Sequence, residues 1–220
     1  MTTRCFSQES FPCVSQSNKT TKIRFMLPNS SNIGLKEWAV TSSALGRGEQ
    51  IFMLRKGGIR EDGRHFKIEH EQFFLYPGLF HEGELLLKKD KQELLVETTD
   101  ADFSNEITLS VFCKLEETIE ISEEQQVRSL DPFHIWSEEF PVKRFNWKPR
   151  HPLKLMIVRA YRLNSPVTLS VDSTYAGCKS WVDLTNEIDL TDITPALSDT
   201  EFNAQVPAIH AALAAEPINA

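Results

Sequence analysis

The sequence has few of the features that mark several large classes of protein. Its four cysteines form no C-x-x-C pair and show no metal-ligand spacing, so neither a disulfide framework nor a cysteine zinc site is expected. No apolar run approaches the roughly 20 residues of a membrane-spanning helix, and the N-terminal residues lack the apolar core of a secretory signal. These absences predict a cytoplasmic protein without a membrane partner.

Two catalytic signatures are missing as well. No Asp-x-Lys or Glu-x-Lys occurs in the chain, whereas the common metal-dependent nuclease core places such a pair on a strand. Gly57-Gly58 follows an apolar run but lacks the Gly-Lys-Ser/Thr ending of a P-loop. The sequence therefore favours neither the cutting subunit of a nuclease nor a P-loop enzyme.

What is present is enough for one folded domain. The chain has 220 residues, of which 40% are hydrophobic, and this suffices for a sizeable core. A formal net charge of -7 argues against a nonspecific coat for nucleic acid but allows a local basic patch. Residues 1–33 are rich in Ser, Thr, Gln and Asn, which is typical of a flexible tail. We expect a single domain over 34–215 and a C-terminal tail over 216–220.

Short apolar runs predict most of the strands. Leu35–Leu45 and Gln50–Lys56 flank a Gly-containing turn, which predicts a hairpin. Leu153–Leu163 is strongly apolar and predicts a central strand. Pro141 interrupts an extended segment and bars a regular central strand there. Further extended segments are expected at Phe66–Ile68, Phe73–Tyr76, Ile107–Ile121, Ile135–Phe140, Val142–Trp147 and Ser180–Leu184.

Three segments predict helices. Glu84–Thr99 is rich in Leu, Lys, Glu and Gln, which favours a helix over the alternative of a second hairpin. Ser122 is placed to cap a helix over Glu123–Ser129. Apolar residues recur at helical spacing in Phe202–Ala215. Together with the strands, these helices predict an α+β fold in which a mixed β-sheet is flanked by helices.

Two basic segments are the candidate binding surfaces. Lys143–Lys154 interleaves cations with Phe and Trp, which suits phosphate contacts and base stacking, although a half-buried edge strand gives the same alternation. Arg55–Arg60 joins a strand end to two glycines and three cations, which suits an anion or a plain turn. The candidate ligand-binding or nucleic-acid-binding residues are Arg55, Lys56, Arg60, Lys143, Arg144, Trp147, Lys148 and Arg150.

A carboxylate and histidine cluster around Tyr76–Thr99 is the candidate metal site. On a helix, Glu93 and Glu97 stand four residues apart and face the same side, so that they can share a hard cation. His81 lies close by in the sequence and is a third candidate ligand. The alternative is that the histidines are polar residues bonded to the turn and that the glutamates belong to a solvated helix face.

Several stretches resemble a known family. LKEWAV, QIFMLRKGGIRE, EHEQFFLYPGLFHE, HIWSEEFPVKRFNWKPRHPLKLMIVRAYRL and YAGCKSWVDL are similar to uncharacterised bacterial proteins, prominent in cyanobacteria, catalogued as domain of unknown function 1802. The resemblance runs from Leu35 to about Leu184. Association of some members with restriction-modification genes implies a nucleic-acid context.

Tyr76–Thr99 also bears a remote resemblance to Nudix hydrolases. The sequence motif of that family, the Nudix box, has a glycine and several glutamates at fixed spacing, partly on a helix. Gly78, Glu84, Glu93 and Glu97 match this spacing. Three box positions are not matched: Gln92, Val96 and Thr99. The resemblance implies a Nudix-like α/β/α sandwich and Mg²⁺-dependent cleavage of diphosphates, with Glu84, Glu93 and Glu97 as the catalytic residues.

Three hypotheses for function follow. The leading one is a noncatalytic binding module for a phosphate-bearing ligand or nucleic acid, which needs no cofactor. The alternatives are a divergent Mg²⁺-dependent diphosphate hydrolase, for which Mg²⁺ is the cofactor, and a scaffold whose basic segment faces an acidic protein surface.

Overall fold

The structure is a computed structural model that describes residues 26–56, 66–78, 86–95, 103–177 and 179–215. Most of the predicted N-terminal tail and the predicted C-terminal tail lie outside these ranges. Among the described residues, no helix has the length and apolar character needed to cross a membrane.

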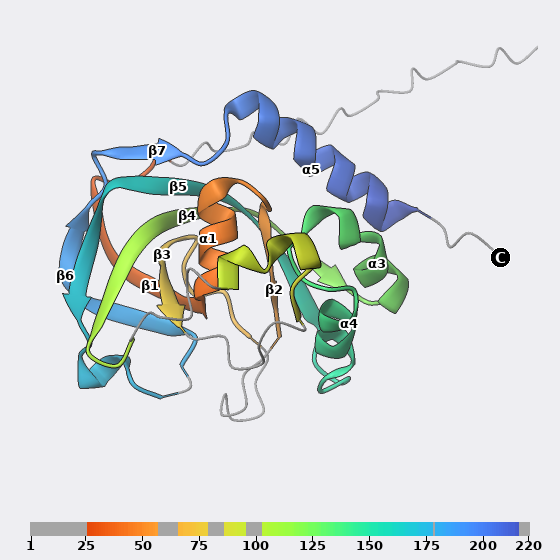
Figure 1. The fold of residues 1–220 in the computed structure, drawn as a ribbon, viewed down its shortest axis with the longest axis horizontal. Helices are drawn as coiled ribbons and strands as arrows, with labels where there is room; N and C mark the ends of the chain where they lie inside the picture. Colours follow the sequence, from red (N-terminus) through yellow and green to blue (C-terminus); the bar gives the residue numbers. More distant parts are fainter. Residues whose placement is uncertain (1–25, 57–65, 79–85, 96–102, 178, 216–220) are drawn as a thin grey trace, which may run out of the picture.

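One mixed sheet organises the chain (Figure 1). The strands follow the order β2-β5-β4-β3-β1-β6, with β7 paired to β5. Strands β1 and β3 are parallel and the other pairings are antiparallel. The predicted α+β class with a mixed sheet is confirmed. The strand bounds are β1 Ser30–Trp38, β2 Phe52–Arg55, β3 Gln72–Gly78, β4 Glu106–Ile121, β5 Leu153–Ser170, β6 Trp181–Asp189 and β7 Ile193–Pro195.

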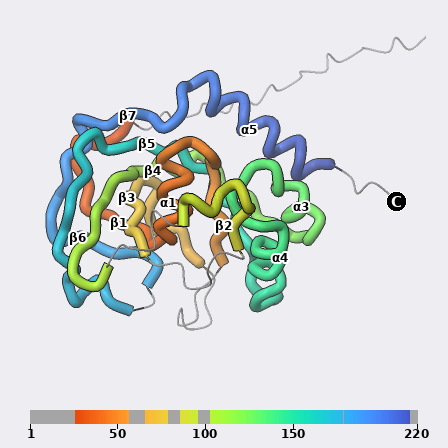
Figure 2. The backbone as a smooth tube through the Cα atoms, in the orientation of Figure 1, coloured from red at the N-terminus to blue at the C-terminus, as the bar shows by residue number. Residues whose placement is uncertain are grey.

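The sheet curls strongly because its two longest strands bend. The pairing of β4 with β5 shifts register twice, between Leu109 and Val111 and again between Leu115 and Glu117, and such bulges bend a strand and increase its twist. The curl brings β2 close to β1 although three strands separate them in the sheet (Figure 2). Arg55 Nη1 of β2 donates a hydrogen bond of 3.0 Å to the carbonyl oxygen of Lys36 in β1.

Helices flank the curled sheet, as predicted. Helix α1 packs against β1, β3, β4 and β5, while α3, α4 and α5 lie along the β2 and β5 end of the sheet (Figure 1). The side chains of β2 alternate between two cores. Phe52 and Leu54 face the core shared with the helices, and Met53 faces the core inside the curl. The helix bounds are α1 Ala39–Arg47, α3 Glu124–Ser129, α4 Glu139–Asn146 and α5 Asp199–Ala214, with short 3₁₀ helices η2 Lys89–Lys91, η3 Asp131–Phe133 and η4 Ser173–Tyr175.

The predicted hairpin at Leu35–Lys56 is wrong. Strand β1 ends at Trp38 and the chain continues as α1, in which Val40, Ala44 and Leu45 are buried at helical spacing. Gly48 ends this helix with a φ of 71°, and a Cβ on Gly48 would stand 2.5 Å from Leu197 Cδ2. The glycine therefore serves as a helix terminator, and β1 and β2 pair with other strands.

The segment around Pro141 is a helix and not a pair of extended runs. Pro141 is the third residue of α4, in the first turn, where backbone N–H groups have no intrahelical acceptor and proline is tolerated. Helix α3 is capped by Glu123 and not by Ser122, because the Gln126 side chain accepts a hydrogen bond from the Glu123 backbone N–H.

The strand predicted at Phe66–Ile68 is wrong, and the helix predicted at Glu84–Thr99 is wrong over part of its range. Phe66–Ile68 is not in a strand, and Leu87 lies in an isolated bridge with Trp136 where a helix was expected. The strands predicted around Phe52, Phe74, Ile107–Ile121, Leu153–Leu163 and Val182 are confirmed, as is the C-terminal helix.

Candidate ligand-binding pocket

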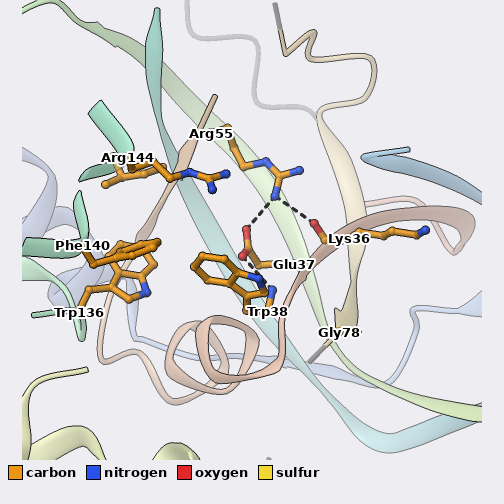
Figure 3. Close-up of a pocket in the computed structure, with 9 residues that line it drawn as sticks. Lys36, Glu37, Trp38, Arg55, Gly78, Trp136, Phe140 and Arg144 are labelled. Carbon is orange, nitrogen blue, oxygen red and sulfur yellow. Dashed lines mark hydrogen bonds and ion pairs between the residues drawn. The ribbon is translucent and has the colours of Figure 1, made fainter. Parts of the chain in front are cut away.

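A pocket of about 220 Å³ opens where β1, β2 and β3 end beside α4 (Figure 3). Strands β1 and β3 are parallel, so that Trp38 and Gly78 come to the same edge of the sheet as register partners. The curl of the sheet brings the end of β2 close to these two strand ends. The side chains that shape the pocket are Glu37, Trp38, Arg55, Trp136, Phe140 and Arg144.

Three aromatic rings form one wall of the pocket. The Phe140 ring centroid lies 5.1 Å from that of Trp38 and 5.6 Å from that of Trp136, with tilted planes. Trp136 and Phe140 are almost fully buried, whereas Trp38 is partly exposed. The wall therefore has a fixed apolar base and one ring that solvent reaches.

Backbone hydrogen bonds hold Trp136 in this wall. Leu87 pairs with Trp136 in a bridge that includes a bond of 2.8 Å from the Ser137 N–H to the Leu86 carbonyl. The fully buried Gln50 accepts a hydrogen bond of 3.2 Å from the Ile135 N–H through its Oε1. Because neighbouring backbone groups on both sides of Trp136 are bonded, its indole has a defined position.

The opposite side of the pocket carries guanidinium groups. Arg55 Nη1 donates to Glu37 Oε2 over 3.1 Å, and both side chains are nearly buried. The other oxygen of Glu37 accepts from the Trp38 backbone N–H at 2.9 Å. Arg144 extends from α4 with its guanidinium carbon 5.6 Å from the centre of the Trp38 ring. In Figure 3 the Arg55 guanidinium points toward Glu37 and the Lys36 carbonyl.

Lys36 contributes its backbone to the pocket and sends its side chain away from it (Figure 3). Its ammonium group donates to the carbonyl oxygens of Tyr175 and Gly177, the latter at 2.9 Å. Lys36 therefore ties β1 to the η4 segment.

Lys56 connects the two predicted basic segments. It is buried, its Nζ donates to the Phe145 carbonyl oxygen in α4, and it lies 5.4 Å from the centre of the Phe145 ring. Burial lowers the pKa of Lys56, and the nearby Arg144 charge lowers it further. Arg55 and Lys56 of one segment thus stand beside Arg144 of the other, although about ninety positions separate them.

Lys56 and the remaining residues of the predicted binding set lie outside the pocket lining. Lys143 is exposed and forms an ion pair of 3.3 Å with Glu139 on its own helix. Lys148 lies over the Trp147 ring at 4.7 Å, and Arg150 is exposed. Arg60 lies outside the described residues.

Sequence reasoning missed four pocket residues: Glu37, Trp38, Trp136 and Phe140. No local pattern marks them, because they come from two segments about 100 positions apart and meet only through the curl of the sheet. The one available signal is the presence of Trp and Phe close to the predicted basic segment.

The predicted metal site is only partly described. Glu93 is exposed in a helical turn at residues 93–95 that follows η2, whereas Glu84, Glu97 and His81 lie outside the described residues. Among the residues that are described, no group of three His, Cys, Asp or Glu side chains is placed to hold a metal ion. His70 packs edge-on against Trp181 with centroids 5.3 Å apart.

Comparison with known proteins gives one family. The family model described as "Domain of unknown function (DUF1802)" matches residues 34–208. No curated protein matches the chain. A crystal structure of a mutant ZmASCH protein from Zymomonas mobilis is similar with a TM-score of 0.39 and 11% identity, covering 83% of this chain and 99% of that one.

Proposed function

Since the chain belongs to the DUF1802 family, whose description names no activity, we propose a function from its own pocket: a noncatalytic binding module for a phosphate-bearing ligand, with nucleic acid as the partner. The observation that carries this proposal is the meeting of Arg55, Lys56 and Arg144 beside a wall of three aromatic rings.

The local charge supports an anionic ligand. The guanidinium groups of Arg55 and Arg144 line the pocket, and Glu37 is the carboxylate among its described lining residues. Lys56 lies close to Arg144, outside the lining, and adds to the positive charge. Both oxygens of Glu37 already accept hydrogen bonds. A planar guanidinium such as that of Arg144 presents paired donors that match phosphate oxygens. A positive site in a chain with a net charge of -7 attracts phosphate locally, while the rest of the surface does not bind anions nonspecifically.

The aromatic wall supports a ligand that also carries rings. Aromatic side chains next to cations are the usual combination in proteins that bind single-stranded nucleic acid, because bases stack on the rings while phosphates meet the cations. Inorganic phosphate alone would leave the apolar wall without a contact. A nucleotide chain uses both sides of the pocket.

Arg144→Ala is expected to weaken binding of a fluorescently labelled single strand of about 12 nucleotides by roughly tenfold, because a charge-assisted contact is lost. Fluorescence anisotropy in a magnesium-free buffer measures this change. The matched control is Lys143→Ala, the adjacent cation on the same helix, which is bound to Glu139 outside the pocket lining.

Binding by the unaltered protein should also fall as salt rises from about 50 to 200 mM, since counterions are released from the strand. Absence of binding at the lower salt concentration would exclude the proposed function. Equal losses in the two variants would exclude the pocket as its site.

The hydrolase alternative remains a separate proposal with Mg²⁺ as its cofactor. It requires Glu84, Glu93 and Glu97 to converge, and of these Glu93 is described and exposed. Mg²⁺-dependent release of phosphate from nucleoside diphosphate conjugates, abolished by Glu97→Gln, would support it over the binding function.

A further inference from the structure

Two observations restrict the chemical class of the ligand, and the first is that one aromatic ring of the pocket is accessible. Trp38 is partly exposed, whereas Phe140 and Trp136 beneath it have exposed fractions of 7% and 2%. The Arg144 guanidinium carbon lies 5.6 Å from the centre of the Trp38 ring in a cation–π contact. A planar ligand ring that stacks on the exposed part of Trp38 would therefore have the Arg144 cation beside it, where an adjoining phosphate can meet it.

The second observation is a pair of hydrogen-bond donors. Arg55 Nε and Trp136 Nε1 are buried and have no hydrogen-bond partner among the described residues. Their residues are 9% and 2% exposed and both line the pocket. Buried donors in folded proteins are nearly always paired. Both of these groups are N–H donors, so the complementary ligand offers acceptors.

We propose that the pocket receives one unpaired base of a nucleic acid, selected for a carbonyl oxygen on its inserted edge. The base stacks on Trp38, its carbonyl oxygen accepts from Trp136 Nε1 or Arg55 Nε, and its phosphate meets Arg144. Thymine, uracil and guanine have a carbonyl oxygen at the position where adenine has an amino group, which is a hydrogen-bond donor. This inference rests on the proposed function, and it specifies how the same site reads its ligand.

A duplex does not satisfy these requirements. Its bases are stacked and their Watson–Crick edges are paired, so a base enters the pocket only after it has left the stack, at a cost of a few kcal/mol. Arg55 also lies inside the pocket, where its ion pair with Glu37 is nearly buried, and not on a surface that follows a helical backbone. The preferred ligand is therefore a single strand or an extruded base.

The test uses full-length protein and labelled strands of about 12 abasic units, each with one central base or none. Anisotropy titrations compare thymine, guanine, adenine and the fully abasic strand. We expect the strand with thymine or guanine to bind about tenfold more tightly than the abasic strand, with adenine closer to the abasic strand. This design removes stacking between neighbouring bases from the comparison.

Two variants test whether the dependence of affinity on the base arises in the pocket. Trp136→Phe keeps an aromatic ring but removes the indole N–H, and it should reduce the preference for thymine over adenine without changing the salt dependence. Trp38→Leu should lower all base-bearing strands to the abasic level. Lys143→Ala is the control that should retain both preferences, and thermal unfolding of each variant checks that it is folded.

The outcomes separate this inference from the proposed function. Equal affinity for abasic and base-bearing strands would overturn base insertion while leaving phosphate binding intact. A preference for adenine, or a thymine preference that survives in Trp136→Phe, would overturn the carbonyl selection. Failure of every strand to bind would remove both the proposed function and this inference.

Discussion

At the scale of single residues, a buried histidine packs behind the aromatic wall of the pocket. His134 is buried, with its ring 5.3 Å from that of Trp136 and 6.3 Å from that of Phe52. Burial and the positive charge of Lys88 lower the pKa of His134 to about 4, from an ordinary value of 6.5. The imidazole is therefore neutral at neutral pH and behaves as part of the aromatic core.

This residue predicts an acid-sensitive stability. Between pH 6.5 and 4 the unfolded chain binds a proton at His134 that the folded chain does not, so the free energy of unfolding falls as the pH is lowered through this interval. The contribution of His134 to this loss is about 3 kcal/mol in total. Urea unfolding at pH 7 and at pH 5 should show the decrease. His134→Phe should make it markedly smaller, and an identical decrease in that variant would assign the acid sensitivity to other groups.

At the scale of elements, α5 shows how a helix can be well anchored and still carry an internal defect. Ser198 and Glu201 form a reciprocal capping box, and Arg159 of β5 holds the first turn through an ion pair of 2.5 Å with Asp199. Pro207 nevertheless lies in the interior of the helix with its ring exposed. A proline there lacks the N–H that would bond to the preceding turn.

Pro207→Ala is therefore expected to raise the free energy of unfolding, by about 1–3 kcal/mol, because it restores a backbone hydrogen bond at an exposed position. Ala208→Gly is the matched control, since the neighbouring exposed change should lower stability by about 1 kcal/mol. Chemical denaturation of the two variants measures both. A less stable Pro207→Ala protein would mean that the ring makes a contact that α5 needs.

The elements also show where sequence reasoning succeeds and where it fails. Helix α5 was predictable because Phe202 and Ile209, both buried, lie two turns apart within one segment. Helix α4 was not, because Pro141 in the first turn of a helix gives the same sequence signal as Pro141 in a broken strand. Arg55 and Arg144 of the pocket and the neighbouring Lys56 were predicted from local charge. Their meeting with Trp38 depends on two bulges in β4 and β5, which no short stretch of sequence encodes.

At the scale of the whole molecule, strand β1 begins at Ser30, before residue 34, the domain boundary predicted from composition. Ser30 and Ser31 of β1 pair with Asp189 and Ile188 of β6, and the Leu190 N–H donates to the Asn29 carbonyl at 2.8 Å. We propose that residues 26–215 form the folding unit, because β1 pairs with both β3 and β6 and α5 buries Phe202 and Ile209 in the core shared with the helices.

A chain that starts at residue 34 should be less stable than one that starts at residue 26, by about 2 kcal/mol, since it loses the first backbone bonds between β1 and β6. The measurement is urea unfolding of the two chains side by side. Strand binding should differ little between them, because the pocket lies at the other end of β1. Equal unfolding midpoints would place the start of the folding unit at or after residue 34.

The ion pair between Arg55 and Glu37 has a consequence for how the molecule responds to a ligand. The same Arg55 side chain that lines the pocket also joins β2 to β1 across the curl. Any ligand that favours the closed position of Arg55 also favours the closed position of the two strands, and by thermodynamic linkage the closed strands favour the ligand. A ligand bound in the pocket should therefore stabilise the contact between β1 and β2.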